Sequence, residues 1–245
     1  MARHELVVVG ASAGGVEALR TMIDGLDPEL AAAVCVVQHV PAQASSLLPI
    51  LLQRHPQLPA SHAVDGEPIQ PRHIYVAPPD HHLLVQGTVL RLGHGPRENN
   101  SRPAIDPLFR SAARWYGERC IGVVLSGMLD DGTAGLVSIK QAGGVTIAQD
   151  PADAQYPSMP RSAIEEAQVD HVASAHGIGR LVSKLVRERG SAKPEAQGDD
   201  ARSEAEADVA LAGSEDATPA EIAKGVPASF GCPECGGALW RLEDG

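Results

Sequence analysis

Val7-Val8-Val9-Gly10-Ala11-Ser12-Ala13-Gly14-Gly15 is the stretch that decides the fold of this 245-residue chain. An apolar, β-branched run ends in Gly-x-Ser-x-Gly, and a helical pattern begins directly after it. This layout is typical of a nucleophile elbow, a tight strand-to-helix turn that exposes one serine hydroxyl. Gly14 and Gly15 are predicted to keep side chains away from that hydroxyl, and the new helix directs its free N–H groups at the same place. The turn therefore predicts a site for an oxyanion beside Ser12.

Two further polar residues follow apolar, strand-like runs. His39 comes after residues 33–38, and Asp131 comes shortly after residues 121–126. A lone His in such a place is often structural, and an Asp-Gly pair is most often a turn. Their joint placement with Ser12 favours a catalytic triad, because the carboxyl ends of parallel strands meet at one edge of a sheet. Ser12 would then be the nucleophile, His39 the general base and Asp131 the acid that orients the imidazole.

Strand and helix patterns alternate along the first 189 residues, which predicts one α/β domain with a doubly wound, mostly parallel sheet. An antiparallel hairpin over residues 83–92 interrupts the alternation, because a Gln-Gly turn joins two alternating runs. The predicted strands are 5–9, 33–38, 73–77, 121–126 and 145–148, and the predicted helices are 15–26, 45–54, 104–116, 133–142, 161–167 and 177–189.

Composition divides the rest of the chain into two segments. Residues 190–228 are rich in Ala, Glu, Asp, Ser and Gly, which predicts a disordered acidic linker because such a segment buries too little apolar surface to order. Residues 229–245 hold Cys232 and Cys235, a pair that resembles half of a zinc ribbon. Two thiolates do not close a tetrahedral zinc site, so we expect a metal there only if another chain or missing sequence completes it.

Charge and hydropathy exclude several classes of protein. The formal net charge of −11 argues against non-specific binding of nucleic acid, although much of it lies in the acidic segment. No run is long enough for a membrane span or a signal peptide, so we expect no membrane insertion and a cytoplasmic location. Cys35 and Cys120 lie in apolar runs and are predicted to be buried, reduced side chains. We expect no cofactor.

A dinucleotide-binding domain is the competing interpretation of the glycine-rich turn. Its fingerprint has glycine where Ser12 stands, and an acidic residue after the second strand. Here the second strand ends in Gln38 and His39. Both differences weigh against a dinucleotide cofactor. A non-catalytic interaction protein with a vestigial triad is the other alternative, and the intact residue types disfavour it.

Six motifs in order resemble the catalytic domain of the bacterial chemotaxis protein-glutamate methylesterases, the CheB family. They are Val9-Gly10-Ala11-Ser12-Ala13-Gly14-Gly15, Gln38-His39-Val40-Pro41, Tyr75-Val76-Ala77-Pro78, Arg102-Pro103-Ala104-Ile105-Asp106-Pro107-Leu108-Phe109, Leu125-Ser126-Gly127-Met128-Leu129-Asp130-Asp131-Gly132 and Ser158-Met159-Pro160-Arg161. The resemblance covers about residues 5–187. Four arginines surround the fourth motif and could meet an acidic partner or form a solvated helix face: Arg97, Arg102, Arg110 and Arg114.

The resemblance implies hydrolysis of glutamyl methyl esters on the cytoplasmic helices of chemoreceptors, and deamidation of receptor glutamines. It assigns Ser12, His39 and Asp131 to the triad, and the backbone N–H groups of Ala13 and Met128 to the oxyanion. The sequence departs from the family in having Ala13 where Thr is frequent and Asp130 where Asn is common. It also begins almost at the first strand, so we expect no receiver domain and a regulator that acts in trans.

Overall fold

The computed structural model describes residues 4–44 and 46–188, together with the strands β10 (Val226–Gly231) and β11 (Ala238–Arg241). A seven-stranded parallel sheet forms the centre of the domain, in the order β3-β4-β2-β1-β7-β8-β9. Its strands are β1 (Leu6–Ala11), β2 (Ala33–Gln38), β3 (Ala60–His62), β4 (Ile74–Val76), β7 (Cys120–Val124), β8 (Val145–Gln149) and β9 (His171–Ala173). The chain winds outward from β1 in one direction and from β7 in the other, so the crevice between these two strands is the topological switch point.

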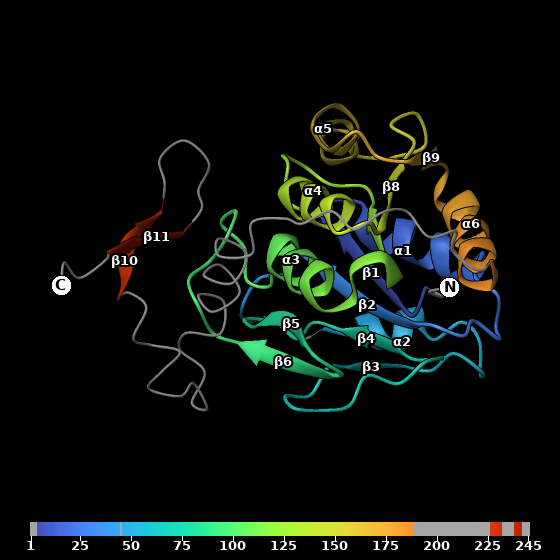
Figure 1. The fold of residues 1–245 in the computed structure, drawn as a ribbon, viewed down its shortest axis with the longest axis horizontal. Coiled ribbons are helices and arrows are strands. Elements are labelled where there is room, and N and C mark those ends of the chain that lie inside the picture. Colours follow the sequence, from blue (N-terminus) through green and yellow to red (C-terminus); the bar gives the residue numbers. More distant parts are fainter. Residues whose placement is uncertain (1–3, 45, 189–225, 232–237, 242–245) are drawn as a thin grey trace.

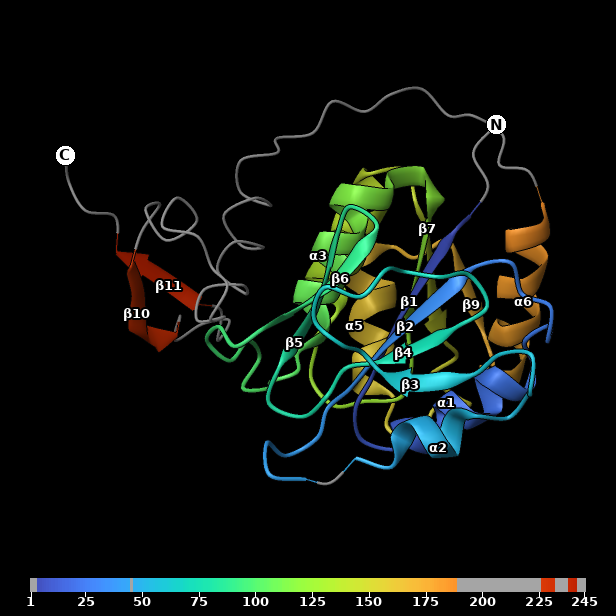
Figure 2. The ribbon, with the colours of Figure 1, turned by 90° about the horizontal axis from the view of Figure 1, so that it is seen from below.

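Helices cover both faces of the sheet, and each face has its own apolar core (Figures 1 and 2). One face is covered by α1 (Gly15–Asp24), α2 (Leu48–Leu52) and α6 (Ala175–Arg187). The other is covered by α3 (Ile105–Tyr116), α4 (Thr133–Gln141) and α5 (Ser158–Ala167). A separate antiparallel hairpin, β5 (His82–Gln86) and β6 (Val89–Gly93), packs beside α3, and a short 3-10 turn (Gly117–Arg119) precedes β7. The doubly wound fold and its hairpin are confirmed.

The central strands are buried along their whole length, which explains why continuous apolar runs marked them so clearly. Every residue of β1, β2 and β7 is buried, as expected for parallel strands covered on both faces. Cys35 and Cys120 lie in these strands as free, buried thiols, and burial raises the pKa of each. The prediction for both cysteines is confirmed.

Several predicted boundaries are wrong. The helix expected over residues 45–54 is only α2, and α5 begins at Ser158, one turn before the predicted start. The short edge strands β3 and β9 were not predicted, because three half-exposed residues carry no clear alternation of apolar and polar positions. Most of the predicted acidic linker and the pair Cys232/Cys235 lie outside the described residues, although β10 begins within the last residues assigned to that linker.

No helix in the described part of the chain is long and apolar enough to cross a membrane.

Candidate active site

Ser12 begins the turn that joins β1 to α1, and the two carbonyl groups of this turn are tied back into the protein. The Gln38 side chain donates to the Ser12 carbonyl at 2.8 Å, and the Ser126 hydroxyl donates to the Ala13 carbonyl at 2.8 Å. The Ser12 hydroxyl itself makes no hydrogen bond within the described residues. The turn therefore holds its backbone firmly and leaves the Oγ atom of Ser12 half-exposed and available to a substrate.

The backbone strain of this turn lies at Gly14, two residues after the serine. Gly14 has a φ of 70°, a left-handed conformation that favours glycine. A Cβ atom there would lie 2.8 Å from the Ser126 hydroxyl, and one at Gly15 would lie 2.3 Å from the Gln38 amide oxygen. These glycines make room for the side chains that hold the turn, and the prediction that they also clear space above the serine hydroxyl stays a prediction.

His39 is placed beside Ser12 by the register of two neighbouring strands. Ala11 and Gln38 are direct partners in the β1–β2 ladder, and the ladder continues with a 3.1 Å hydrogen bond from the His39 N–H to the Ala11 carbonyl. Ser12 directly follows Ala11, and His39 directly follows Gln38. Because parallel strands lie about 4.8 Å apart, this register makes the two side chains neighbours at the edge of the sheet.

Asp131 comes to the same place from the loop that follows β7. Its Oδ2 atom lies 2.7 Å from Nε2 of His39 and accepts the Ile105 N–H at 2.8 Å. Its Oδ1 atom accepts the Asn99 side-chain amide at 2.7 Å and the Asp106 N–H at 3.1 Å. Four donors thus converge on one carboxyl group, the number that an ionised carboxylate accepts.

Burial and hydrogen bonding act in opposite directions on this carboxyl group. The Asp131 side chain is 2% exposed, and burial alone would raise its pKa. The hydrogen bond and charge of His39, with the Ile105 N–H and Asn99, outweigh burial and hold the pKa of Asp131 below its usual range. An ionised Asp131 favours the tautomer of His39 with its proton on Nε2, which leaves Nδ1 as the ring atom that can accept a proton.

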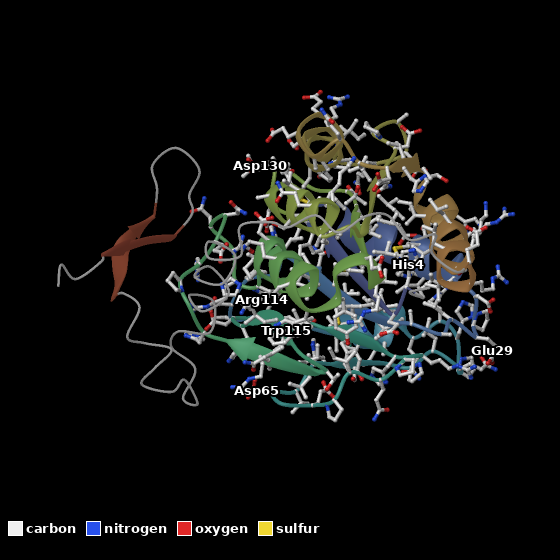
Figure 3. The ribbon with its side chains drawn as sticks, in the orientation of Figure 1. His4, Glu29, Asp65, Arg114, Trp115 and Asp130 are labelled. Carbon is white, nitrogen blue, oxygen red and sulfur yellow. The ribbon has the colours of Figure 1, made fainter. Side chains whose placement is uncertain are left out.

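The neighbouring Asp130 lies in a different environment. Its side chain is exposed and projects from the surface near α4 (Figure 3). The backbone carbonyl of Asp130 accepts the Thr133 N–H at 3.0 Å, which closes the turn that leads into α4. The structure therefore brings Asp131 and not Asp130 to His39.

Two backbone N–H groups, of Ala13 next to Ser12 in the chain and of Met128 in a neighbouring loop, have no partner within the described residues. The loop that carries Met128 adjoins Ser12, since a Cβ atom at Gly127 would lie 3.1 Å from the Ser12 Cβ atom. Unpaired backbone donors of this kind are suited to stabilising negative charge on an oxygen atom.

The described residues contain no candidate metal site. No group of three or more His, Cys, Asp or Glu side chains gathers there in a way that could hold a metal ion. Among the other histidines, His82 lies at the start of β5. It is fully buried, its Nε2 lies 2.9 Å from the Pro96 carbonyl, and burial lowers its pKa to about 4.

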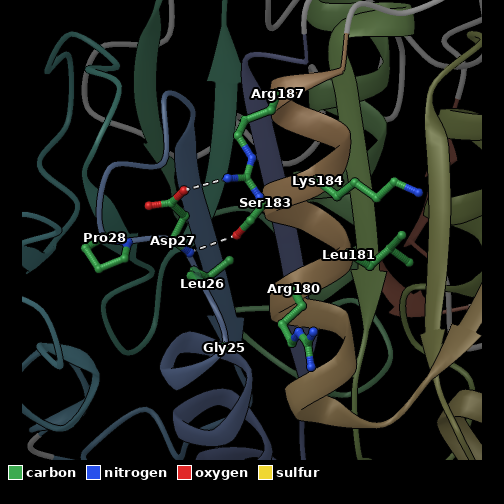
Figure 4. A pocket seen from close by; sticks show the side chains of 9 residues that line it. All are labelled: Gly25, Leu26, Asp27, Pro28, Arg180, Leu181, Ser183, Lys184 and Arg187. Atoms are coloured by element: carbon green, nitrogen blue, oxygen red, sulfur yellow. Dashed lines mark hydrogen bonds and ion pairs between the residues drawn. The ribbon is translucent and has the colours of Figure 1, made fainter.

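A groove also lies away from this site. It has a volume of about 520 Å³ and runs between the end of α1 and the second half of α6 (Figure 4). Arg187 and Asp27 form an exposed ion pair at its rim, at 3.3 Å. Since α6 begins near the carboxyl end of β9 and runs back along the sheet, this half of α6 lies toward the opposite end of the strands.

Comparison with known proteins gives a consistent result. A family model described as "CheB methylesterase" matches residues 7–182. The crystal structure of the CheB methylesterase catalytic domain of Thermotoga maritima superimposes with a TM-score of 0.71 at 35% sequence identity, covering 76% of this chain and all of that one.

Two curated relatives differ in how much of their length is matched. The chain is 41% identical to protein-glutamate methylesterase/protein-glutamine glutaminase 2 of Anaeromyxobacter dehalogenans, over 76% of this chain and 54% of that protein. It is 38% identical to a putative protein-glutamate methylesterase/protein-glutamine glutaminase of Leptospira interrogans, over 74% of this chain and 95% of that protein. The chain thus spans about half the length of the first relative and nearly all of the second.

Proposed function

The chain belongs to the CheB methylesterase family, and we propose that it hydrolyses methyl esters of glutamate side chains in proteins and deamidates glutamine side chains. The 2.7 Å contact between buried Asp131 and His39, with Ser12 in register beside the imidazole, is the observation that carries this proposal. Ser12 acts as the nucleophile, His39 as the general acid and base, and Asp131 as the group that fixes the tautomer of His39.

The reaction begins when Nδ1 of His39 accepts the Ser12 proton and Oγ attacks the carbonyl carbon of the ester. The N–H groups of Ala13 and Met128 stabilise the oxyanion of the tetrahedral intermediate. The intermediate collapses as the imidazolium donates its proton to the leaving oxygen, which departs as methanol. Asp131 stays ionised throughout and stabilises the imidazolium electrostatically.

Water completes the cycle by hydrolysing the glutamyl ester of Ser12. His39 accepts a proton from that water and donates it to the departing Oγ atom as the second tetrahedral intermediate collapses. This step restores the serine hydroxyl and releases the glutamate carboxyl group, which ionises in solvent. A glutamine side chain follows the same route with ammonia as the leaving group. The names of the relatives support both activities, and the site has the donors and the base that each requires.

The substrates we propose are the methylated cytoplasmic helices of bacterial chemoreceptors, and we place the enzyme in the cytoplasm where those helices lie. A role as a non-catalytic docking protein is disfavoured, because four hydrogen bonds still hold Asp131 in place for His39. A vestigial triad would have no need of so costly a buried carboxylate.

Methanol release from methylated receptor membranes tests the proposal. The purified chain should release methanol, and Ser12→Ala should lower the rate by about 10⁴-fold or more, because no other nucleophile replaces Oγ. A folded Ser12→Ala variant that works within tenfold of the wild type would refute the mechanism.

A further inference from the structure

A second buried carboxyl group, that of Asp106, lies directly behind the triad acid. The side chain is almost completely buried in the first turn of α3. Its Oδ1 atom accepts the N–H of Gly132 at 3.1 Å and the N–H of Gly135 at 2.7 Å. These donors belong to the first turn of α4, so Asp106 caps that helix from outside.

The two carboxyl groups cap each other's helices. Asp131 stands just before α4 and accepts the first two N–H groups of α3, those of Ile105 and Asp106. Asp106 stands in α3 and accepts two N–H groups at the start of α4. Both helix N-termini favour negative charge at this point. Movement of either acid therefore disturbs the helix that positions the other.

Asn99 joins the two acids through a single nitrogen atom. Its Nδ2 lies 2.7 Å from Oδ1 of Asp131 and 3.1 Å from Oδ2 of Asp106. The φ angle of Asn99 is 47°, a left-handed conformation that non-glycine residues adopt at some cost in free energy. Strain of this kind persists where surrounding contacts hold the residue in place.

The loop that carries Asn99 is anchored on both sides. Buried Glu98 forms a 2.7 Å ion pair with Arg110 of α3, and His82 contacts the Pro96 carbonyl and accepts the Ala104 N–H. Arg110 was considered above as a residue that could meet an acidic partner, but its side chain is only 8% exposed. Its burial contradicts that expectation, because the Arg110 side chain is held inside the protein by its ion pair with Glu98 of this loop.

Charge is distributed unequally over the carboxylate pair Asp106 and Asp131. Burial and the neighbouring charge of Asp131 raise the pKa of Asp106 to about 8, whereas the pKa of Asp131 is lowered. The other charged groups that face Asp106 are Arg110, which favours its ionised form, and Glu98, which opposes it. At neutral pH the single negative charge of the pair therefore resides on Asp131, where it stabilises His39.

We propose that Asn99 and Asp106 are positioning residues that hold Asp131 against Nε2 of His39. Neither residue touches His39 or Ser12, so both act through Asp131. The inference rests on the proposed function, because it assigns the two residues a role in the same serine hydrolase reaction. Asn99 and Asp106 would thus support the triad from behind Asp131, without belonging to it.

Replacement of the bridging amide is the sharpest test. Asn99→Ala should lower kcat for ester hydrolysis by about 10- to 100-fold, the range found when a partner that orients a functional residue is lost. KM should stay within twofold if Asn99 acts through Asp131, which its amide contacts at 2.7 Å. The number of active sites should be titrated with a fluorophosphonate probe of Ser12, so that kcat refers to folded enzyme only.

Asn100→Ala is the matched control. Asn100 follows Asn99 in the same loop, has a left-handed φ of 59° and is exposed, and its side chain bonds to no described residue. This variant should keep kcat within twofold of the wild type. If Asn99→Ala also keeps kcat within twofold, the inference is wrong. Ser12→Ala separates the two proposals, since a fully active Ser12→Ala would instead refute the hydrolase mechanism.

Asp106→Asn provides a readout that a purely structural role would not change. In the wild type, a second negative charge appears beside Asp131 as pH rises through about 8, and we expect the labelling rate of Ser12 to change there. Asp106→Asn has no proton to lose and should remove that inflection. It serves as the test even if Asn99→Ala does not fold. A pH profile with the same inflection in both proteins would overturn the role of Asp106.

Discussion

The carboxyl edge of the sheet and the groove between α1 and α6 both gather titratable side chains, but these differ in burial and in the number of their hydrogen bonds. At the edge, Asp131 and Asp106 are buried and each carboxyl group accepts hydrogen bonds from at least three donors. In the groove, Arg187 is 67% exposed and is joined to Asp27 by a single 3.3 Å contact (Figure 4). Charge in the groove is thus held more loosely than charge at the edge.

The difference follows from the cost of burying charge. A buried carboxylate is tolerated only where enough donors replace its lost water, so natural chains keep such a group where it has a use. An exposed ion pair costs little and contributes little. Burial with many donors is therefore the property that distinguishes the candidate site from the groove.

The largest expected effect lies at the edge and separates two adjacent acids. Asp131→Asn should lower the turnover of ester substrates by about 10³- to 10⁴-fold, because an amide at this position favours the wrong tautomer of His39. Asp130→Asn should cost less than tenfold, since the Asp130 side chain is exposed. Steady-state kinetics on both variants measure the difference, and the reverse ranking would show that the triad acid has been misplaced.

The sequence predicted this edge because strand ends carry a local signature. An apolar run followed by Ser12 or His39 is visible without any knowledge of the tertiary structure, and the same is true of the loop that carries Asp131. Asn99 and Asp106 were not predicted as part of the site. Asn99 reaches Asp131 only because α3, α4 and β5 bring the loop there, and no spacing in the sequence encodes that approach.

A smaller effect is expected where α3 approaches β1. A Cβ atom at Gly10 would lie 2.3 Å from Cγ2 of Ile105, the residue whose N–H holds Asp131. Gly10→Ala should therefore lower the free energy of unfolding by about 1–3 kcal/mol, as overpacking of a core typically does, and should also reduce kcat. Denaturant unfolding and kinetics test the two effects together. A variant as stable and active as the wild type would show that Ile105 yields without moving Asp131.

The carboxylate pair should also make stability depend on pH. The folded pKa of Asp106 is raised to about 8, so its contribution to stability is fully present below about pH 4 and is lost as pH rises through 8. Asp131 has a lowered pKa and affects only the acid side. From pH 5 to pH 8.5 the melting temperature of the wild type should fall relative to that of Asp106→Asn. Parallel melting curves across this range would contradict the shift.

The smallest effect is expected in the groove, where the charged groups are exposed. Arg187→Ala should change the free energy of unfolding by less than about 1 kcal/mol and leave kcat unchanged, because an exposed, singly bonded ion pair is screened by water and salt.

Ser183→Ala is the matched contrast at the same groove, because its hydroxyl is buried. It accepts the Asp27 N–H at 2.8 Å and donates to the Gly179 carbonyl at 2.9 Å. Its loss should cost about 1–3 kcal/mol by leaving the half-buried Asp27 N–H unpaired, again without a change in kcat. Urea unfolding and ester hydrolysis should be measured on both variants. If Arg187→Ala proved the more damaging to either property, burial with many donors would no longer distinguish the functional edge from the groove.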